Sequence, residues 1–101
     1  MSIKQKSLEI LAKYIMSSQL FIDYAGSSSV DLIMDFLDSK EFKVLNPVVE
    51  DIKYIIKDFI NDDSINPSQL ETLINGMIDY SYRDLIDRAV HNFFDGLNLF
   101  F

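Results

Sequence analysis

The chain has 101 residues, of which 49% are hydrophobic and none is cysteine. Its 16 Asp and Glu residues outnumber its 9 Lys and Arg residues, which gives a formal net charge of −7. The length predicts one domain over residues 1–101, and the absence of cysteine excludes disulfides, thiolate metal sites and a cysteine nucleophile. The N-terminal residues lack the pattern of an export signal, and no apolar run approaches the ~20 residues of a membrane-spanning helix. We therefore expect a folded, cytoplasmic protein.

The negative charge is concentrated in the part of the chain after residue 25. Residues 1–25 contain three Lys and two acidic residues, a net charge of +1, so the remaining 6 basic and 14 acidic residues carry a net charge of −8. Such a surface repels the phosphate backbone, because affinity for nucleic acids comes mainly from Lys and Arg. It attracts basic proteins instead. We expect a basic protein partner and no direct binding of nucleic acid.

The first predicted helix covers residues 2–24. Leu8, Leu11 and Ile15 recur at intervals of three and four residues, which is the period of one helix face. The polar group at residues 16–19 can interrupt this helix, because Ser side chains compete for backbone hydrogen bonds.

The second predicted helix runs to about Phe42 after an N-cap at Ser28. Its apolar side contains Val30, Leu32, Ile33, Phe36 and Leu37. Asp31, Asp35 and Asp38 form a carboxylate stripe on another side, without interleaved Lys to neutralise it. The stripe is either an ordinary solvated face or a surface that contacts a partner.

The third predicted helix begins at Asn46–Pro47, which we interpret as an N-cap followed by proline in the first helical position. An apolar stripe that includes Ile52, Ile56 and Ile60 predicts burial along most of its length. Asp58, Asp62 and Asp63 gather at its C-terminal end, where the helix dipole favours cations. These three carboxylates are a second candidate for the partner-binding surface.

Asn66 and Gln69 predict a capping box at the start of a fourth helix, with Ile65 able to pack on Leu70. Ser81 and Asp84 have the spacing of another helix start. They either begin a fifth helix or lie within a continuation of the fourth. In both cases, we expect Gly96 to end the last helix.

Aromatic residues provide a third candidate surface at Tyr80 and Tyr82, since tyrosine often anchors protein interfaces. The C-terminal aromatic run from Phe93 to Phe101 is expected to pack mostly in the core. Its last residues, Leu97–Phe101, dock either on this domain or on a partner.

Catalysis is not expected from this sequence. The single His, His91, follows Asp87 by one turn, a spacing that can orient an imidazole, but no nucleophile or second base accompanies the pair. One His without Cys does not make a typical zinc site, and the acidic run that begins at Asp62 lacks the Gly and Glu of a calcium loop. We expect neither a metal nor a cofactor.

In size, acidity and helix pattern the chain resembles the small helical immunity proteins that neutralise bacterial toxins. They include inhibitors of tRNA-cleaving toxins of the colicin D class and of contact-dependent inhibition systems. The resemblance covers Glu50–Met77, where the acidic helix end Asp58–Asp63 leads through a capped turn into Gln69–Glu71. It implies that carboxylates take the place of RNA phosphates in a basic toxin cleft.

The sequence therefore predicts an all-α fold, a compact bundle of four to five short antiparallel helices. The expected function is that of an acidic inhibitor, an immunity protein that binds a basic nuclease toxin. The alternative is a phage-type or regulatory helical adaptor that binds transcription, defence or replication machinery. Both would use the same acidic surface.

Overall fold

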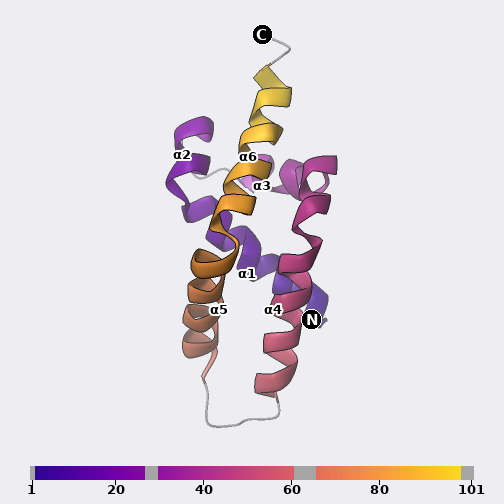
Figure 1. Ribbon diagram of the computed structural model, residues 1–101, viewed down its shortest axis with the longest axis vertical. Coiled ribbons are helices and arrows are strands. Elements are labelled where there is room, and N and C mark those ends of the chain that lie inside the picture. The colour runs from indigo at the N-terminus through magenta and orange to yellow at the C-terminus, as the bar shows by residue number, and fades with distance from the viewer. Residues whose placement is uncertain (1, 27–29, 61–65, 99–101) are drawn as a thin grey trace.

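The computed structural model describes residues 2–26, 30–60 and 66–98, and these residues form helices without any strand (Figure 1). The all-α prediction is confirmed. The described ranges contain six α-helices and one 3-10 helix, more than the four to five helices that we expected. In chain order these are α1 Ile3–Ser17, α2 Gln19–Ala25, α3 Val30–Leu37, the 3-10 helix η1 Lys40–Leu45, α4 Asn46–Ile60, α5 Pro67–Ser81 and α6 Arg83–Asn98.

The predicted first helix is divided at Ser18, inside the polar group where an interruption was anticipated. Ser18 has an extended backbone (φ −72°, ψ 143°), and its hydroxyl donates to the Ile15 carbonyl at 2.8 Å. The same hydroxyl oxygen accepts a hydrogen bond from the Phe21 N–H at 3.3 Å and so caps α2. Ser18 therefore ends one helix and begins the next, as expected for a side chain that competes with the helical hydrogen bonds.

The predicted second helix ends at Leu37 and does not reach Phe42. Ser39 has an extended backbone (φ −80°, ψ 160°), and its hydroxyl donates to the Phe36 carbonyl at 2.6 Å. The chain resumes as η1, whose three-residue period places both Phe42 and Leu45 in the core. Ser28, the expected N-cap of this helix, lies outside the described residues.

The N-cap predicted at Asn46 is wrong. Asn46 has helical dihedral angles (φ −53°, ψ −41°), and its N–H donates to the Lys43 carbonyl. Because η1 leads directly into α4, the first turn of α4 obtains partners from the preceding helix and needs no capping side chain. The buried stripe of α4 includes Ile52 and Ile56, as predicted, whereas Ile60 is largely exposed.

The capping box of α5 is confirmed. The Asn66 side chain accepts from the Gln69 N–H at 2.9 Å, and the Gln69 side chain accepts from the Asn66 N–H at 3.1 Å. A separate helix α6 follows after a break at Tyr82 (φ −130°, ψ 1°). The prediction that Gly96 ends the last helix is wrong, because α6 continues through it to Asn98.

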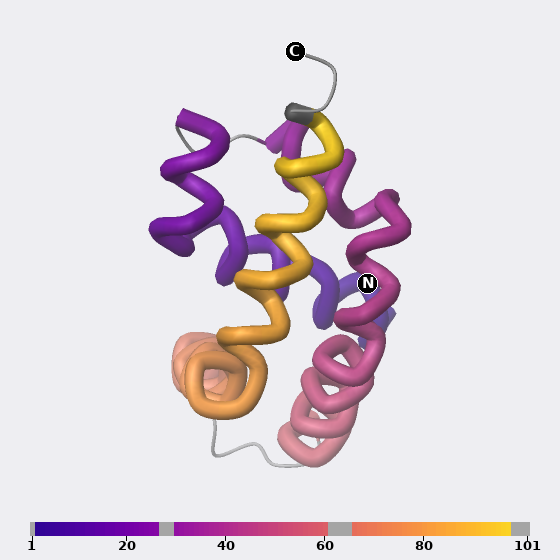
Figure 2. The backbone as a smooth tube through the Cα atoms, turned by 45° about the horizontal axis from the view of Figure 1, so that its top comes forward, coloured from indigo at the N-terminus to yellow at the C-terminus, as the bar shows by residue number. Residues whose placement is uncertain are grey.

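Packing places α6 between α2 on one side and η1 on the other, as Figures 1 and 2 both show. Aromatic rings fill these contacts: Phe94 meets Phe21 of α2 at 5.6 Å between ring centroids, and Phe93 meets Phe36 of α3 at 5.3 Å. The most extensive contact of α1 is with α4. One cluster of buried side chains thus joins elements from the whole described length. The molecule is elongated, with principal extents of 50 × 25 × 22 Å.

Candidate functional site

The outward side of α3 combines apolar and acidic side chains on one short helix. Val30 and Met34, one turn apart, are 64% and 54% exposed. Asp31 and Asp35 are also exposed on the same turns, and Asp38, one residue after the end of α3, is exposed as well. We refer to these five residues as the α3 face. The expectation that Val30 belongs to the buried side is wrong, because the buried residues of α3 are Ile33 and Phe36.

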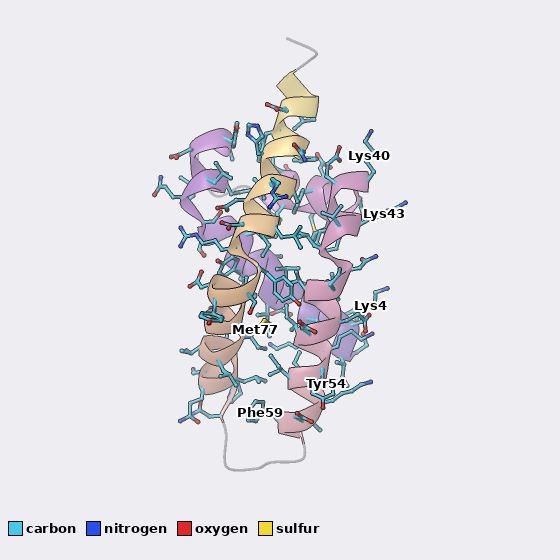
Figure 3. All side chains as sticks on the ribbon, in the orientation of Figure 1. Lys4, Lys40, Lys43, Tyr54, Phe59 and Met77 are labelled. Carbon is cyan, nitrogen blue, oxygen red and sulfur yellow. The ribbon has the colours of Figure 1, made fainter. Side chains whose placement is uncertain are left out.

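The three carboxylates of the α3 face form no ion pair with any described residue. Acidic residues elsewhere do: Glu9 lies 3.7 Å from the Lys13 ammonium, and Glu50 lies 3.3 Å from that of Lys53. The two lysines that follow α3, Lys40 and Lys43, extend outward from η1 (Figure 3). The negative field of the α3 face is therefore not neutralised within the part of the chain that the structure describes.

Asp58, the described residue of the second candidate surface, lies far from the α3 face. Asp58 is exposed near the C-terminal end of α4, at the lower end of the view in Figure 1, whereas α3 lies in the upper half. Asp62 and Asp63 lie outside the described residues. Among the described acidic candidates, Asp58 therefore does not share a patch with the α3 face. Tyr54 on α4, which no sequence pattern had indicated as a candidate, is 68% exposed.

The two tyrosines of the third candidate surface have different surroundings. Tyr80 is 94% exposed at the end of α5. Tyr82 is partly buried, and its hydroxyl donates to the Asp51 carboxylate on α4. That hydrogen bond raises the pKa of Tyr82 above its ordinary value, and partial burial adds to the shift. Tyr82 therefore ties the α5–α6 break to α4, whereas Tyr80 is free to meet a partner.

His91 lies beside Tyr24 and Asp95. Its Nδ1 atom is 2.5 Å from the Tyr24 hydroxyl, and its Nε2 atom is 3.2 Å from an Asp95 oxygen. The carboxylate that accompanies the imidazole is thus one turn after it, and not Asp87, one turn before it, as the sequence had indicated. The Tyr24 ring also stacks on Phe94, with 4.9 Å between centroids, so the network holds α2 against α6.

Within the described ranges there is no group of three or more His, Cys, Asp or Glu side chains suited to a metal ion. No helix in those ranges is long and apolar enough to cross a membrane. Comparisons with protein-family models, with curated proteins and with solved structures give no match to this chain.

Proposed function

We propose that this protein is an acidic inhibitor that binds and blocks a basic protein, as an immunity protein blocks a nuclease toxin. The observation that carries the proposal is the α3 face: Val30 and Met34 are exposed beside three carboxylates that lack ion pairs within the described chain. Protein interfaces commonly have an apolar centre and a polar rim, and complementary charge speeds encounter. The α3 face has both parts.

The proposed mechanism divides the work between the two kinds of side chain. Asp31, Asp35 and Asp38 would stand in for the phosphates that a nuclease cleft binds, and their field would steer the basic partner toward α3. Val30 and Met34 would then be buried against the partner and slow its dissociation. The proposal places this complex in the bacterial cytoplasm, and it requires no cofactor or metal.

The test begins with pull-down from the source cell and identification of a basic partner. Association rates are then measured for the wild type and for a double variant, Asp31→Lys with Asp35→Lys. A matched pair on α4, Glu50→Lys with Asp58→Lys, makes the same change in net charge away from α3. We expect the α3 pair to slow association clearly more than the α4 pair, because local charge dominates steering at physiological salt. Equal effects would remove α3 as the binding surface.

The proposal assigns no catalytic role to His91. We therefore expect His91→Ala to leave inhibition of the partner intact, since the imidazole serves a contact between α2 and α6. Inhibition is measured by residual partner activity at saturating concentrations of the variant, with circular dichroism to confirm that it is folded. Loss of inhibition by a folded variant would revive an enzymatic interpretation.

A regulatory adaptor is the second candidate, and one observation supports a docking surface for it other than the acidic surface that both functions were expected to share. Leu73 and Tyr80 are 48% and 94% exposed on α5. A partner that docks there would be recognised by fit and would depend little on charge. Tyr80→Ala then weakens binding while the α3 double variant does not, which separates the two functions.

A further inference from the structure

The exposed residues of α3 form an apolar strip and an acidic strip that run side by side. Successive side chains of a helix are turned by about 100° around its axis. Val30 and Met34 therefore share one edge of the exposed arc, and Asp31 and Asp35 share the other edge. The buried residues of α3, by contrast, belong to the core cluster. Each strip on the α3 face thus has the one-turn repeat of a helix ridge.

Charge and desolvation indicate what covers this face. No described residue forms an ion pair with Asp31, Asp35 or Asp38. A surface without cations would bury these carboxylates unpaired, which is costly. A second copy of the chain is a poor match, because α3 contains no Lys or Arg and the net charge of −7 repels another copy. The occupant is therefore a partner with Lys or Arg beside apolar side chains.

The spacing of the strips indicates the secondary structure of the occupant. An extended segment commonly binds by adding to the edge of a sheet, and the described residues contain no strand. Between two neighbouring strips of a helix runs a groove that accepts the side chains of another helix. Ridges with a repeat of four residues, such as Val30 and Met34, form the commonest class of helix–helix contact. A helix therefore fits the α3 face better than an extended segment does.

We infer that the α3 face binds an amphipathic helix of the partner, apolar along one strip and basic along the next. The inference rests on the proposed function, which supplies the basic partner, and it names the element of that partner that α3 recognises. Apolar side chains of this helix would pack on Val30 and Met34, while its Lys or Arg side chains reach Asp31 and Asp35. Two helical turns bury less than the roughly 1,200 Å² of a stable interface, so we expect an isolated helix to bind weakly.

The test is an NMR titration of the isotope-labelled full chain with a synthetic peptide at physiological salt. The probe is an 18-residue alanine-based helix with capped ends, in which Leu and Lys occupy two neighbouring strips. We expect saturable shifts of the backbone amides of α3, with a dissociation constant on the order of 0.1 to 1 mM. Shifts that do not saturate, or that lie away from α3, would overturn the inference.

Two matched peptides separate a helix from mere positive charge. In the first, two central alanines are replaced by proline, which breaks the helix and keeps every Leu and Lys. In the second, the same residues are redistributed so that Leu and Lys no longer form strips. We expect both to bind at least about tenfold more weakly, because neither can present the two strips together. Equal binding of either peptide would overturn the inference.

Apolar variants of the protein locate the contact. Val30→Ser with Met34→Ser should weaken the affinity for the helical peptide at least about fivefold, because the apolar strip is lost. The matched pair Tyr54→Ser with Leu73→Ser removes exposed apolar side chains from α4 and α5 and should change the affinity less than about twofold. Equal effects of the two pairs would place the peptide elsewhere and contradict the inference.

Charge variants test the acidic strip in the same way. Asp31→Asn with Asp35→Asn should weaken the affinity for the helical peptide at least about fivefold, because two charge-assisted contacts are lost. Glu50→Gln with Asp58→Asn makes the same change in net charge on α4 and should change the affinity less than about twofold. A peptide that binds the α3 variant as tightly as the wild type would overturn the inference.

Sedimentation velocity tests the other occupant, a second copy of the chain. We expect the wild type to be a monomer at the concentrations of the titration. A dimer that dissociates in the variant Val30→Ser with Met34→Ser would assign the α3 face to a second copy and overturn the inference.

Failure of this inference and failure of the proposed function give different results. If no helical peptide binds while Asp31→Lys with Asp35→Lys still slows association of the identified partner, the inference is wrong and the proposed function stands. If the peptide binds α3 while the charge reversal leaves that association rate unchanged, the α3 face binds a helix and the proposed function is wrong.

Discussion

Two residues near the same end of the molecule contribute to stability by different means. Asn66 is exposed and acts through its cap on α5, whereas Ile56 is 4% exposed within the core. Asn66→Ala should therefore cost about 1 kcal/mol of unfolding free energy, the usual loss of a side-chain cap. Ile56→Ala should cost about 2 to 5 kcal/mol, because it leaves a cavity. Urea unfolding followed by circular dichroism measures both, and equal small losses would contradict burial of α4.

Tyr14 makes stability depend on pH in the alkaline range. Burial, and after it the hydrogen bond to Asp79, raise the pKa of the Tyr14 hydroxyl above its ordinary value of about 10. The folded state therefore keeps this proton at pH values where the unfolded state releases it. It follows that the contribution of Tyr14 is complete below pH 10 and declines as the pH rises above about 10.

The comparison of wild type with Tyr14→Phe isolates this contribution, since the variant lacks the titrating group. We expect the wild type to lose unfolding free energy faster than the variant between about pH 9.5 and 11.5. Parallel curves would mean that Tyr14 titrates normally.

Local sequence chemistry predicted some helix boundaries correctly and misplaced others. The cap at Asn66 and the break near Ser18 were predictable, because each depends on side-chain oxygens within three residues. The stop at Ser39 was missed, because its neighbours continue an apolar pattern that a longer helix would share. The N-cap predicted at Asn46 was wrong, because the preceding 3-10 helix η1 provides the hydrogen-bond partners that a capping side chain would otherwise provide. In each failure the deciding factor was the conformation of the adjacent segment.

The candidate sites show the same division between local and long-range information. The acidic stripe of Asp31, Asp35 and Asp38 could be read from helical spacing alone. The exposure of Val30 could not be predicted from helical spacing, because it depends on which side of α3 meets α1 and η1. The partner of Tyr82 is Asp51, 31 residues away, and no pattern in the sequence joins them.

Glycines within the helices provide a prediction for these elements. Gly76 lies inside α5, and a Cβ atom added there would meet nothing within 4 Å. Gly76→Ala should stabilise the protein by about 0.5 to 1 kcal/mol, since alanine has less backbone freedom to lose on folding. Gly26 has φ 78°, so Gly26→Ala should destabilise by about 1 to 2 kcal/mol despite equally open surroundings. Thermal unfolding compares the two, and the same sign for both would contradict the assigned backbone conformations.

For the whole molecule, the net charge of −7 predicts how capture of a basic partner responds to salt. Long-range attraction is screened at physiological ionic strength, where the Debye length is about 8 Å. We expect the association rate to fall severalfold between low and physiological salt, while dissociation changes little. Stopped-flow measurements give both rates. An association rate independent of salt would favour the adaptor that docks on α5.

The position of α6 between α2 and η1 has a consequence for how the protein is made. A ribosome delivers α1 to α5 before α6, and until then Phe21 and Phe36 lack the rings of Phe94 and Phe93 that cover them. The nascent chain therefore cannot complete its core helix by helix. The native state can form only after α6 has left the exit tunnel. Until then, the uncovered aromatic side chains can bind chaperones or aggregate.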